Sequence, residues 1–327
     1  MKKVSISTPG KLMIMGEHAV LYGKPCIVTT IGQRLQVDLE MNNDNYLSIE
    51  ALDVGIDTYK KKVSELGNED IPQGVIFIEK AVENFYQRFN LNRGIKITTR
   101  SQFSSYGLGC SSAVTVSTIK ALSRVFEIPL SNKELFDLAY KTVLDIQGKG
   151  SGFDVAANIY GGTIYFVRGG EVIKAIKTNN LQLLIGYSGV KADTVSLINR
   201  VAEKARINPK LVENIYNKIE NLVKEAKIEI ENKNWKKLGK LFNANQKLLF
   251  ELGVSNKKLE EMISVARKSG AYGVKLSGAG GGDCMIAIVD KENKDQVAGA
   301  ITKAGGQIID TTINAEGVRE ENIPISR

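Results

Sequence analysis

The sequence has very few of the residues that build zinc sites and disulfide frameworks. Its 327 residues include one histidine, His18, and three cysteines, Cys26, Cys110 and Cys284, which lie far apart and form no C-x-x-C pair. A zinc cluster therefore cannot be assembled in the usual way, and the scarcity of cysteine favours a reducing compartment.

Long apolar runs and long basic runs are absent as well. No stretch approaches the roughly 20 apolar residues of a membrane span, and the basic N-terminus reaches Pro9 and Gly10 before any apolar segment of signal-peptide length. The formal charge of +8 is spread over lysines with acids between them, as in "KKLEE" at 257–261. We therefore expect a cytoplasmic protein with no membrane and no nucleic acid as partners, and the net charge favours a small anionic partner.

The length favours two domains, because one domain ordinarily has about 100 to 200 residues. After a strand at 181–189 the pattern changes to long amphipathic helices, which predicts domains 1–180 and 181–327. The expected strands are 2–7, 26–41, 94–103, a hairpin at 161–177, 181–189, a pair flanking the glycines of 273–289, and 306–314. The expected helices are 76–89, 111–126, 132–146 with a capping box at Ser131 and Glu134, 191–206, 209–231, 233–252, one around 259–266, and 292–304.

A glycine-rich loop, "YGLGCSSAVTVS" at 106–117, joins a predicted strand to a predicted helix. Glycines let a backbone approach a phosphate, and the unpaired N–H groups that open a helix attract anions. A hydroxyl of Ser111 or Ser112 is able to bind Mg²⁺. The alternative is a tight turn capped by serine, since lone glycine motifs are common. A free thiol at this helix start also predicts a pKa of Cys110 below its usual range.

Two further segments combine glycine or polar residues with apolar ones. "KLSGAGGGDC" at 275–284 is not a dinucleotide fingerprint, because a strand follows it; it is either a turn that closes over a ligand or a tight hairpin. "STPGKLMIMGEHAVLYGKP" at 7–25 is interpreted as a polar loop in which Lys11 is able to balance a phosphate or a carboxylate. Between them, "GSGFDVAANIYGG" at 150–162 carries a single carboxylate, Asp154.

Together these segments resemble the three signature motifs of the GHMP kinases, in the family's order. "PGKLMIMGEHAVLYGKP" is similar to the first motif in its mevalonate kinase form, "GLGCSSAV" to the second and "KLSGAGGGDC" to the third. "KLFNANQKLLFELGVS" at 240–255 looks like a substrate-side helix of archaeal mevalonate kinases. The resemblance implies an α+β fold, with an N-terminal domain like ribosomal protein S5 domain 2 and a ferredoxin-like C-terminal domain. It also implies ATP and Mg²⁺ meeting an acceptor alcohol between the two domains.

The resemblance further implies roles for single residues. Asp154 matches the catalytic aspartate that acts on the C5 hydroxyl of mevalonate, and Lys11 matches the lysine that pairs with it. Small neighbours of Asp154 are expected to leave room for the alcohol and the phosphoryl group. The implied ATP-binding loop is Gly107, Leu108, Gly109, Cys110, Ser111 and Ser112, with Ser111 as the Mg²⁺ ligand. The implied acceptor residues are Glu17, His18, Tyr22 and Thr194, and the implied third motif is Ser277, Gly278, Ala279, Gly280 and Gly281.

The sequence departs from the mevalonate kinase pattern at Val143, where those enzymes carry a glutamate that binds Mg²⁺. Val143 shares a helix face with Leu135 and Ala139, so we expect it in the core and Asp145 pointing elsewhere. "GSGFDVA" is closer to the phosphomevalonate kinase form, so that activity remains the alternative to mevalonate kinase. A catalytically silent nucleotide-binding relative is a third reading, and a homodimer is left open.

Overall fold

The computed structural model describes residues 2–68, 70–103, 106–178 and 181–322. Its larger sheet has the strand order β12-β1-β2-β5-β3-β4, with β6 beside β2 and β7 beside β6. Only the β3 and β5 pair is parallel among these described strands. The strands are β1 (Lys3–Met15), β2 (Cys26–Met41), β3 (Tyr46–Ala51), β4 (Ile56–Lys62), β5 (Ile95–Ser101), β6 (Thr163–Val167), β7 (Val172–Ala175) and β12 (Arg319–Glu320).

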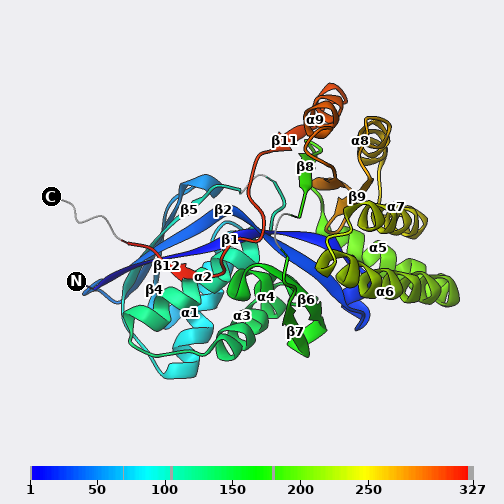
Figure 1. Ribbon diagram of the computed structural model, residues 1–327. Coiled ribbons are helices and arrows are strands. Elements are labelled where there is room, and N and C mark those ends of the chain that lie inside the picture. Colours follow the sequence, from blue (N-terminus) through cyan, green and yellow to red (C-terminus); the bar gives the residue numbers. More distant parts are fainter. Residues whose placement is uncertain (1, 69, 104–105, 179–180, 323–327) are drawn as a thin grey trace.

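A second, antiparallel sheet has the order β11-β8-β10-β9. Its strands are β8 (Leu183–Tyr187), β9 (Gly273–Ser277), β10 (Cys284–Ile288) and β11 (Gln307–Ile309). The two sheets lie in different parts of the molecule, each with its own helices (Figure 1). The expected α+β class is therefore confirmed.

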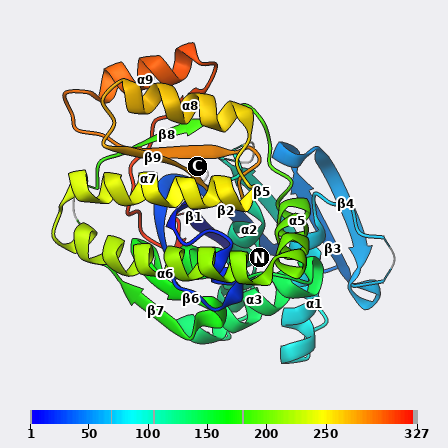
Figure 2. The ribbon, with the colours of Figure 1, turned by 90° about the vertical axis from the view of Figure 1, so that its right-hand side faces the viewer.

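Helices cover both sheets. Helices α1 (Ile76–Phe89), α2 (Cys110–Val125), α3 (Asn132–Gln147) and α4 (Phe153–Tyr160) pack together, and α2 and α4 contact β1 and β2. Figure 2 shows α8 (Lys257–Lys268) and α9 (Lys294–Lys303) on one side of the smaller sheet. On the other side lie α7 (Trp235–Leu252) and α6 (Pro209–Glu231), with α5 (Thr194–Ile207) beside α6. Short 3-10 helices occur at η1 (Ala19–Tyr22), Leu52–Val54, Val63–Glu65 and Arg168–Gly170. No described helix has an apolar stretch long enough to cross a membrane.

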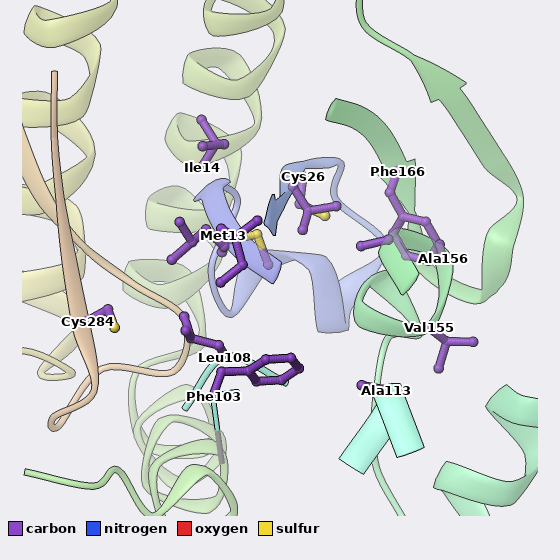
Figure 3. Close-up of a cluster of buried hydrophobic side chains, with 14 of the residues drawn as sticks. Met13, Ile14, Cys26, Phe103, Leu108, Ala113, Val155, Ala156, Phe166 and Cys284 are labelled. Atoms are coloured by element: carbon purple, nitrogen blue, oxygen red, sulfur yellow. The ribbon is translucent and has the colours of Figure 1, made fainter. Parts of the chain in front are cut away.

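One buried hydrophobic cluster connects the two sheets. It contains Met13 of β1, Phe166 of β6 and Cys284 of β10, which are labelled in Figure 3. Burying such side chains is the main favourable contribution to folding, so this shared cluster holds the two sheets in one arrangement.

Local sequence signals explain several element ends. The Ser131 hydroxyl accepts from the N–H of Glu134, and the Glu134 carboxylate accepts from Ser131, which confirms the capping box of α3. The hairpin of β6 and β7 turns at Gly169 (φ 72°) and Gly170 (φ 77°), as expected. The strands on either side of the glycines in 273–289 are also confirmed.

Other expected boundaries were wrong. Strand β1 does not end near residue 7; it runs through Pro9 and Gly10 to Met15, so part of the predicted polar loop is strand. The pairing of β1 with β2 shifts between Pro9 and Gly10, and such an irregularity accommodates a proline that has no N–H to donate. Strand β11 is much shorter than the predicted 306–314, and β3, β4 and α4 were not predicted. The predicted domain boundary near 180 falls beside 179–180, outside the described residues, and stays a prediction.

Candidate functional site

A cavity of about 310 Å³ collects residues from both halves of the chain. Its wall includes the end of β1 with the following turn, the loop before α2 and the loop before α4. The remaining wall comes from α3, from 191–198 and from the glycine turn between β9 and β10. The segments 7–25, 106–117, 150–162 and 275–284 therefore meet at one place, whereas no residue of 240–255 lines the cavity.

The loop at 107–112 leads into the N-terminus of α2. Gly107 (φ 69°) and Gly109 (φ 93°) adopt left-handed backbone conformations, and α2 begins directly after Gly109. No described side chain caps this helix, because the Ser112 hydroxyl donates to the Gly109 carbonyl oxygen at 3.0 Å. The alternative of a serine-capped turn is therefore wrong. The first N–H groups of α2 are left for a ligand, at the positive end of the helix dipole.

Most of the predicted ATP-binding residues line the cavity, and Leu108 does not. Gly107, Gly109, Cys110, Ser111 and Ser112 are in the wall. Leu108 is buried in the hydrophobic cluster near Phe103 (Figure 3), so it anchors the loop from behind. The Ser111 hydroxyl makes no hydrogen bond within the described parts of the chain.

The prediction for the Cys110 thiol is wrong. Burial raises the pKa of Cys110 to about 11, and this effect outweighs the nearby charges of Lys11 and Lys191, which lower it. The thiol donates a weak hydrogen bond to the Phe103 carbonyl oxygen at 3.7 Å. A helix N-terminus lowers a thiol pKa only where the thiolate keeps its solvation, and this side chain faces protein instead.

Asp154 lies in the first turn of α4, a short helix that starts after Gly152 (φ 87°). One carboxylate oxygen accepts a hydrogen bond from the N–H of Val155 at 3.0 Å, and the side chain lines the cavity. The small residues Gly150, Ser151 and Gly152 line the cavity beside Asp154, so the expectation that they leave room for substrate stays a prediction. A Cβ at Gly152 would lie about 3.0 Å from Tyr140, and one at Gly161 would lie 2.2 Å from a backbone nitrogen of residue 317. These two glycines therefore also make room for neighbouring parts of the protein.

Lys11 approaches the cavity from β1. Its ammonium lies 3.5 Å from the Gly107 carbonyl oxygen and 5.6 Å from the centre of the Phe153 ring. Its aliphatic part packs against Gly109, where an added Cβ would lie 2.9 Å from the Lys11 Cε. Lys11 and Asp154, both among the described residues, share the cavity but form no direct ion pair. The expected pairing is therefore not a contact in this structure.

Glu17 is buried where the first half of the chain meets the second. Its carboxylate forms an ion pair with Lys275 of β9, and both side chains have no exposed surface. Asn245 of α7 donates to the second carboxylate oxygen at 3.1 Å. Glu17 lines the cavity, but its two oxygens already have protein partners.

His18 connects the same two regions through a hydrogen bond. The ring Nε2 donates to the Ala279 carbonyl oxygen at 2.8 Å, and burial lowers the pKa of His18 below its usual value. The backbone of His18 has a φ of 58°, which is uncommon for a residue with a side chain. His18 therefore reaches the cavity as a neutral ring held in one orientation.

The other predicted acceptor and third-motif residues divide into two groups. Thr194, Gly278 and Ala279 line the cavity. Ser277, Gly280 and Gly281 are not in its wall: the Ser277 hydroxyl donates to the Met13 carbonyl oxygen at 2.9 Å, and the N–H of Gly281 donates to Val254. Tyr22 is also outside the wall; it is 46% exposed, and its ring stacks on Tyr216 with centroids 4.8 Å apart.

The two expectations about α3 are confirmed. Val143 is buried in the hydrophobic cluster and forms an apolar part of the cavity wall. Asp145 receives hydrogen bonds from Lys141 (2.5 Å) and Asn84 (2.9 Å). In the described parts of the chain, no three His, Cys, Asp or Glu side chains are arranged to hold a metal ion by themselves.

Three charged residues of the wall were missed in the sequence: Lys149, Lys191 and Asp283. Lys149 donates to Asn199 at 3.1 Å. Burial raises the pKa of Asp283 above its usual range, although the Ala192 N–H, Lys11 and Lys191 oppose this. For Asp283 the sequence offered one signal. This acid ends the glycine run "GAGGGDC", and a charged side chain in such a turn is a candidate site residue.

Family models match two parts of the chain. Residues 77–162 match the family model of the GHMP kinases N-terminal domain, and residues 205–307 match that of the GHMP kinases C-terminal region. A mevalonate kinase of Thermococcus gammatolerans is 36% identical, covering 98% of this chain and 100% of the relative. The chain belongs to the GHMP kinase family.

Solved structures place this GHMP kinase among small-molecule kinases. The Methanococcus jannaschii mevalonate kinase has a TM-score of 0.82 at 27% identity, covering 98% of this chain and 99% of that one. A Streptococcus pneumoniae phosphomevalonate kinase has a TM-score of 0.80 at 19% identity, covering 96% and 100%. The second likeness shows the shared fold alone.

Proposed function

We propose that the protein transfers the γ-phosphoryl group of ATP to the C5 hydroxyl of mevalonate, giving 5-phosphomevalonate and ADP. The observation that carries the proposal is the cavity that joins an uncapped helix N-terminus to Asp154 and Lys11. The relative named mevalonate kinase matches the chain over nearly its full length and supports the choice of acceptor.

Asp154 is the proposed catalytic base. Its carboxylate takes the proton of the C5 hydroxyl as that oxygen bonds to the γ-phosphorus and the bond from phosphorus to the ADP oxygen breaks. Lys11 is proposed to stabilise the negative charge of the transferring group, because its ammonium already lies beside the Gly107 carbonyl and the cavity. Phosphate oxygens accept from the free N–H groups at the start of α2.

The donor set of the cavity fits a hard cation. The Ser111 hydroxyl, which has no partner among the described residues, is an oxygen ligand of the type that Mg²⁺ accepts. Val143, which stands where mevalonate kinases carry a metal-binding glutamate, offers the cation no ligand. Mg²⁺ would be held by Ser111 and the nucleotide's own phosphate oxygens, and it would supply positive charge against the triphosphate. On the acceptor side we propose Glu17, His18 and Thr194 as the residues around the alcohol. Tyr22 is proposed at most as a support for this wall through its stacking.

A coupled assay of ADP release tests the proposal with mevalonate, phosphomevalonate, galactose and homoserine as acceptors. We expect turnover with mevalonate, dependent on Mg²⁺. Turnover with phosphomevalonate alone would favour the second candidate, for which Lys149 in the wall would bind the extra phosphate. Binding of ATP without turnover of any acceptor would instead identify a silent nucleotide-binding protein.

A further inference from the structure

Lys191 is a cation of the cavity wall that none of the sequence motifs includes. It belongs to the loop between β8 and α5 and lines the cavity together with the 107–112 loop. The side chain is exposed and forms no ion pair with any residue that the structure describes. Its charge opposes the rise in the pKa of Cys110 and of Asp283 that burial causes. Lys191 is therefore close enough to the loop before α2 to attract an anion bound there.

Asp283 determines where this lysine lies. The backbone N–H of Asp283 donates to the Val190 carbonyl oxygen at 2.7 Å, and its carboxylate accepts from the Ala192 N–H at 3.1 Å. A third bond runs from the Ser188 N–H to the Asp283 carbonyl oxygen at 2.8 Å. Lys191 thus stands between two residues that are both tied to Asp283.

The same carboxylate contacts the loop before α2. A Cβ added at Gly107 would lie 2.1 to 2.5 Å from the Asp283 carboxylate atoms, so only glycine fits against it. Asp283 also has a φ of 52°, an unfavourable left-handed conformation for a residue with a side chain. Backbone strain persists where the surroundings enforce it, and here one residue joins the Lys191 loop to the 107–112 loop.

We propose that Lys191 binds the triphosphate of ATP from the second half of the chain, and that Asp283 is a positioning residue that holds it there. The inference rests on the ATP site proposed above and extends it across the cavity. An ammonium on a flexible stem suits this role, because it follows the phosphate oxygens as a point charge without a demanding geometry.

Calorimetric titration of the full chain with the Mg²⁺ complex of a non-hydrolysable ATP analogue tests the role of Lys191. We expect Lys191→Met to weaken analogue binding about tenfold, because one charge-assisted contact is lost. The loss should shrink as salt is added, since the lysine is exposed and screening weakens exposed charges. The KM for the acceptor should change less than about twofold. Lys240→Met, an exposed lysine of α7 outside this cavity, is the matched control and should bind normally.

Two substitutions separate the positioning role of Asp283 from its charge. Asp283→Asn keeps an oxygen for the Ala192 N–H and tolerates the left-handed backbone, so analogue affinity should be retained. Asp283→Gly relieves the backbone strain and should fold at least as stably, yet it loses the bond to Ala192 and should weaken binding severalfold. A purely structural residue would not separate stability from affinity in this way.

The outcomes that contradict the inference are distinct. If the unmodified chain does not bind the analogue, the ATP site fails and this inference fails with it. If it binds and Lys191→Met binds equally well, only this inference is overturned. Equal losses in Asp283→Asn and Asp283→Gly would overturn the positioning role, because the charge rather than the bond to Ala192 would then matter.

Discussion

The two walls of the cavity differ in what holds them in place. On the first wall, Lys11 extends from a central strand and Asp154 from a helix packed on that strand, and Leu108 anchors the loop between them in the buried cluster. On the second wall, Lys191 and Ala279 lie in loops that are held by hydrogen bonds, such as those from Asp283 to Val190 and from the Ala192 N–H to Asp283. The groups proposed to act on the reacting atoms therefore lie on the rigid wall of packed elements, and Lys191, proposed to bind the triphosphate, lies on the wall built from hydrogen-bonded loops.

The largest expected effect concerns the rigid wall. Asp154→Asn should lower kcat about a thousandfold, because the base that takes the hydroxyl proton is lost, and should change ATP affinity only a few-fold. The measurement is steady-state ADP release with mevalonate, alongside calorimetric binding of the ATP analogue. Asp145→Asn is the matched control, since that acid pairs with Lys141 away from the cavity. An unchanged kcat in Asp154→Asn would remove the proposed base.

The next effect concerns the ion pair that joins the two walls. Glu17→Gln should lower the free energy of unfolding by about 3 kcal/mol, because Lys275 is left buried without its partner. Replacing both residues, as in Glu17→Leu with Lys275→Met, should recover part of this loss. Urea unfolding of the three proteins is the measurement. A single variant as stable as the unmodified chain would show that the pair does not hold the walls together.

A smaller effect follows from His18, which is the only histidine of the chain. Burial holds the pKa of His18 below its usual value of 6.5 in the folded state. As the pH falls through about 6.5, His18 binds a proton more readily in the unfolded chain than in the folded one. The free energy of unfolding is therefore at its full value above that pH and decreases below it. His18→Gln should flatten this part of the stability curve. The urea midpoint, compared above and below pH 6.5, checks the difference; identical curves would contradict it.

The last expected effect is a slower rate of alkylation of the Cys110 thiol. With the pKa of Cys110 raised to about 11, iodoacetamide should modify this thiol about a hundredfold more slowly than an ordinary cysteine at mildly alkaline pH. Mass spectrometry of the peptide that contains Cys110 follows the reaction. The chain unfolded in urea serves as the control and should react at the ordinary rate. Rapid labelling of the folded protein would mean that the start of α2 is more open than the rest of its wall.

Much of the fold was accessible from the sequence because its signals are local. The 3.6-residue spacing of apolar side chains predicted α1 and α6 with their observed ends, and the β-branched run at 26–41 predicted β2. The predicted β1 ended too early because proline and glycine usually end a strand. Only the pairing of β1 with β2 reveals the irregularity that accommodates these two residues. Helix α4 was missed because eight residues are too few for a periodic signal.

The candidate site was accessible only in part. Glycines at 107 and 109 and the acid at 154 stand out in the sequence, and the structure brings them together. Lys191 carries no pattern of its own and Asp283 only its place after the glycine run, because both are positioned by hydrogen bonds between segments about 90 residues apart. Tyr22 lies near the site in sequence, yet its ring packs on Tyr216 and not in the cavity wall.

The sequence by itself determined the class of the fold, the loop that opens α2 and the family, since these depend on residue order and short-range spacing. Only the tertiary structure decided which polar groups are free. In the folded chain Glu17 forms an ion pair with Lys275, and Ser111 has no partner among the described residues. Burial raises the pKa of Cys110, whereas the helix start alone predicted a decrease. The physical reason is that desolvation and pairing depend on what surrounds a group in space, and those neighbours come from distant parts of the chain.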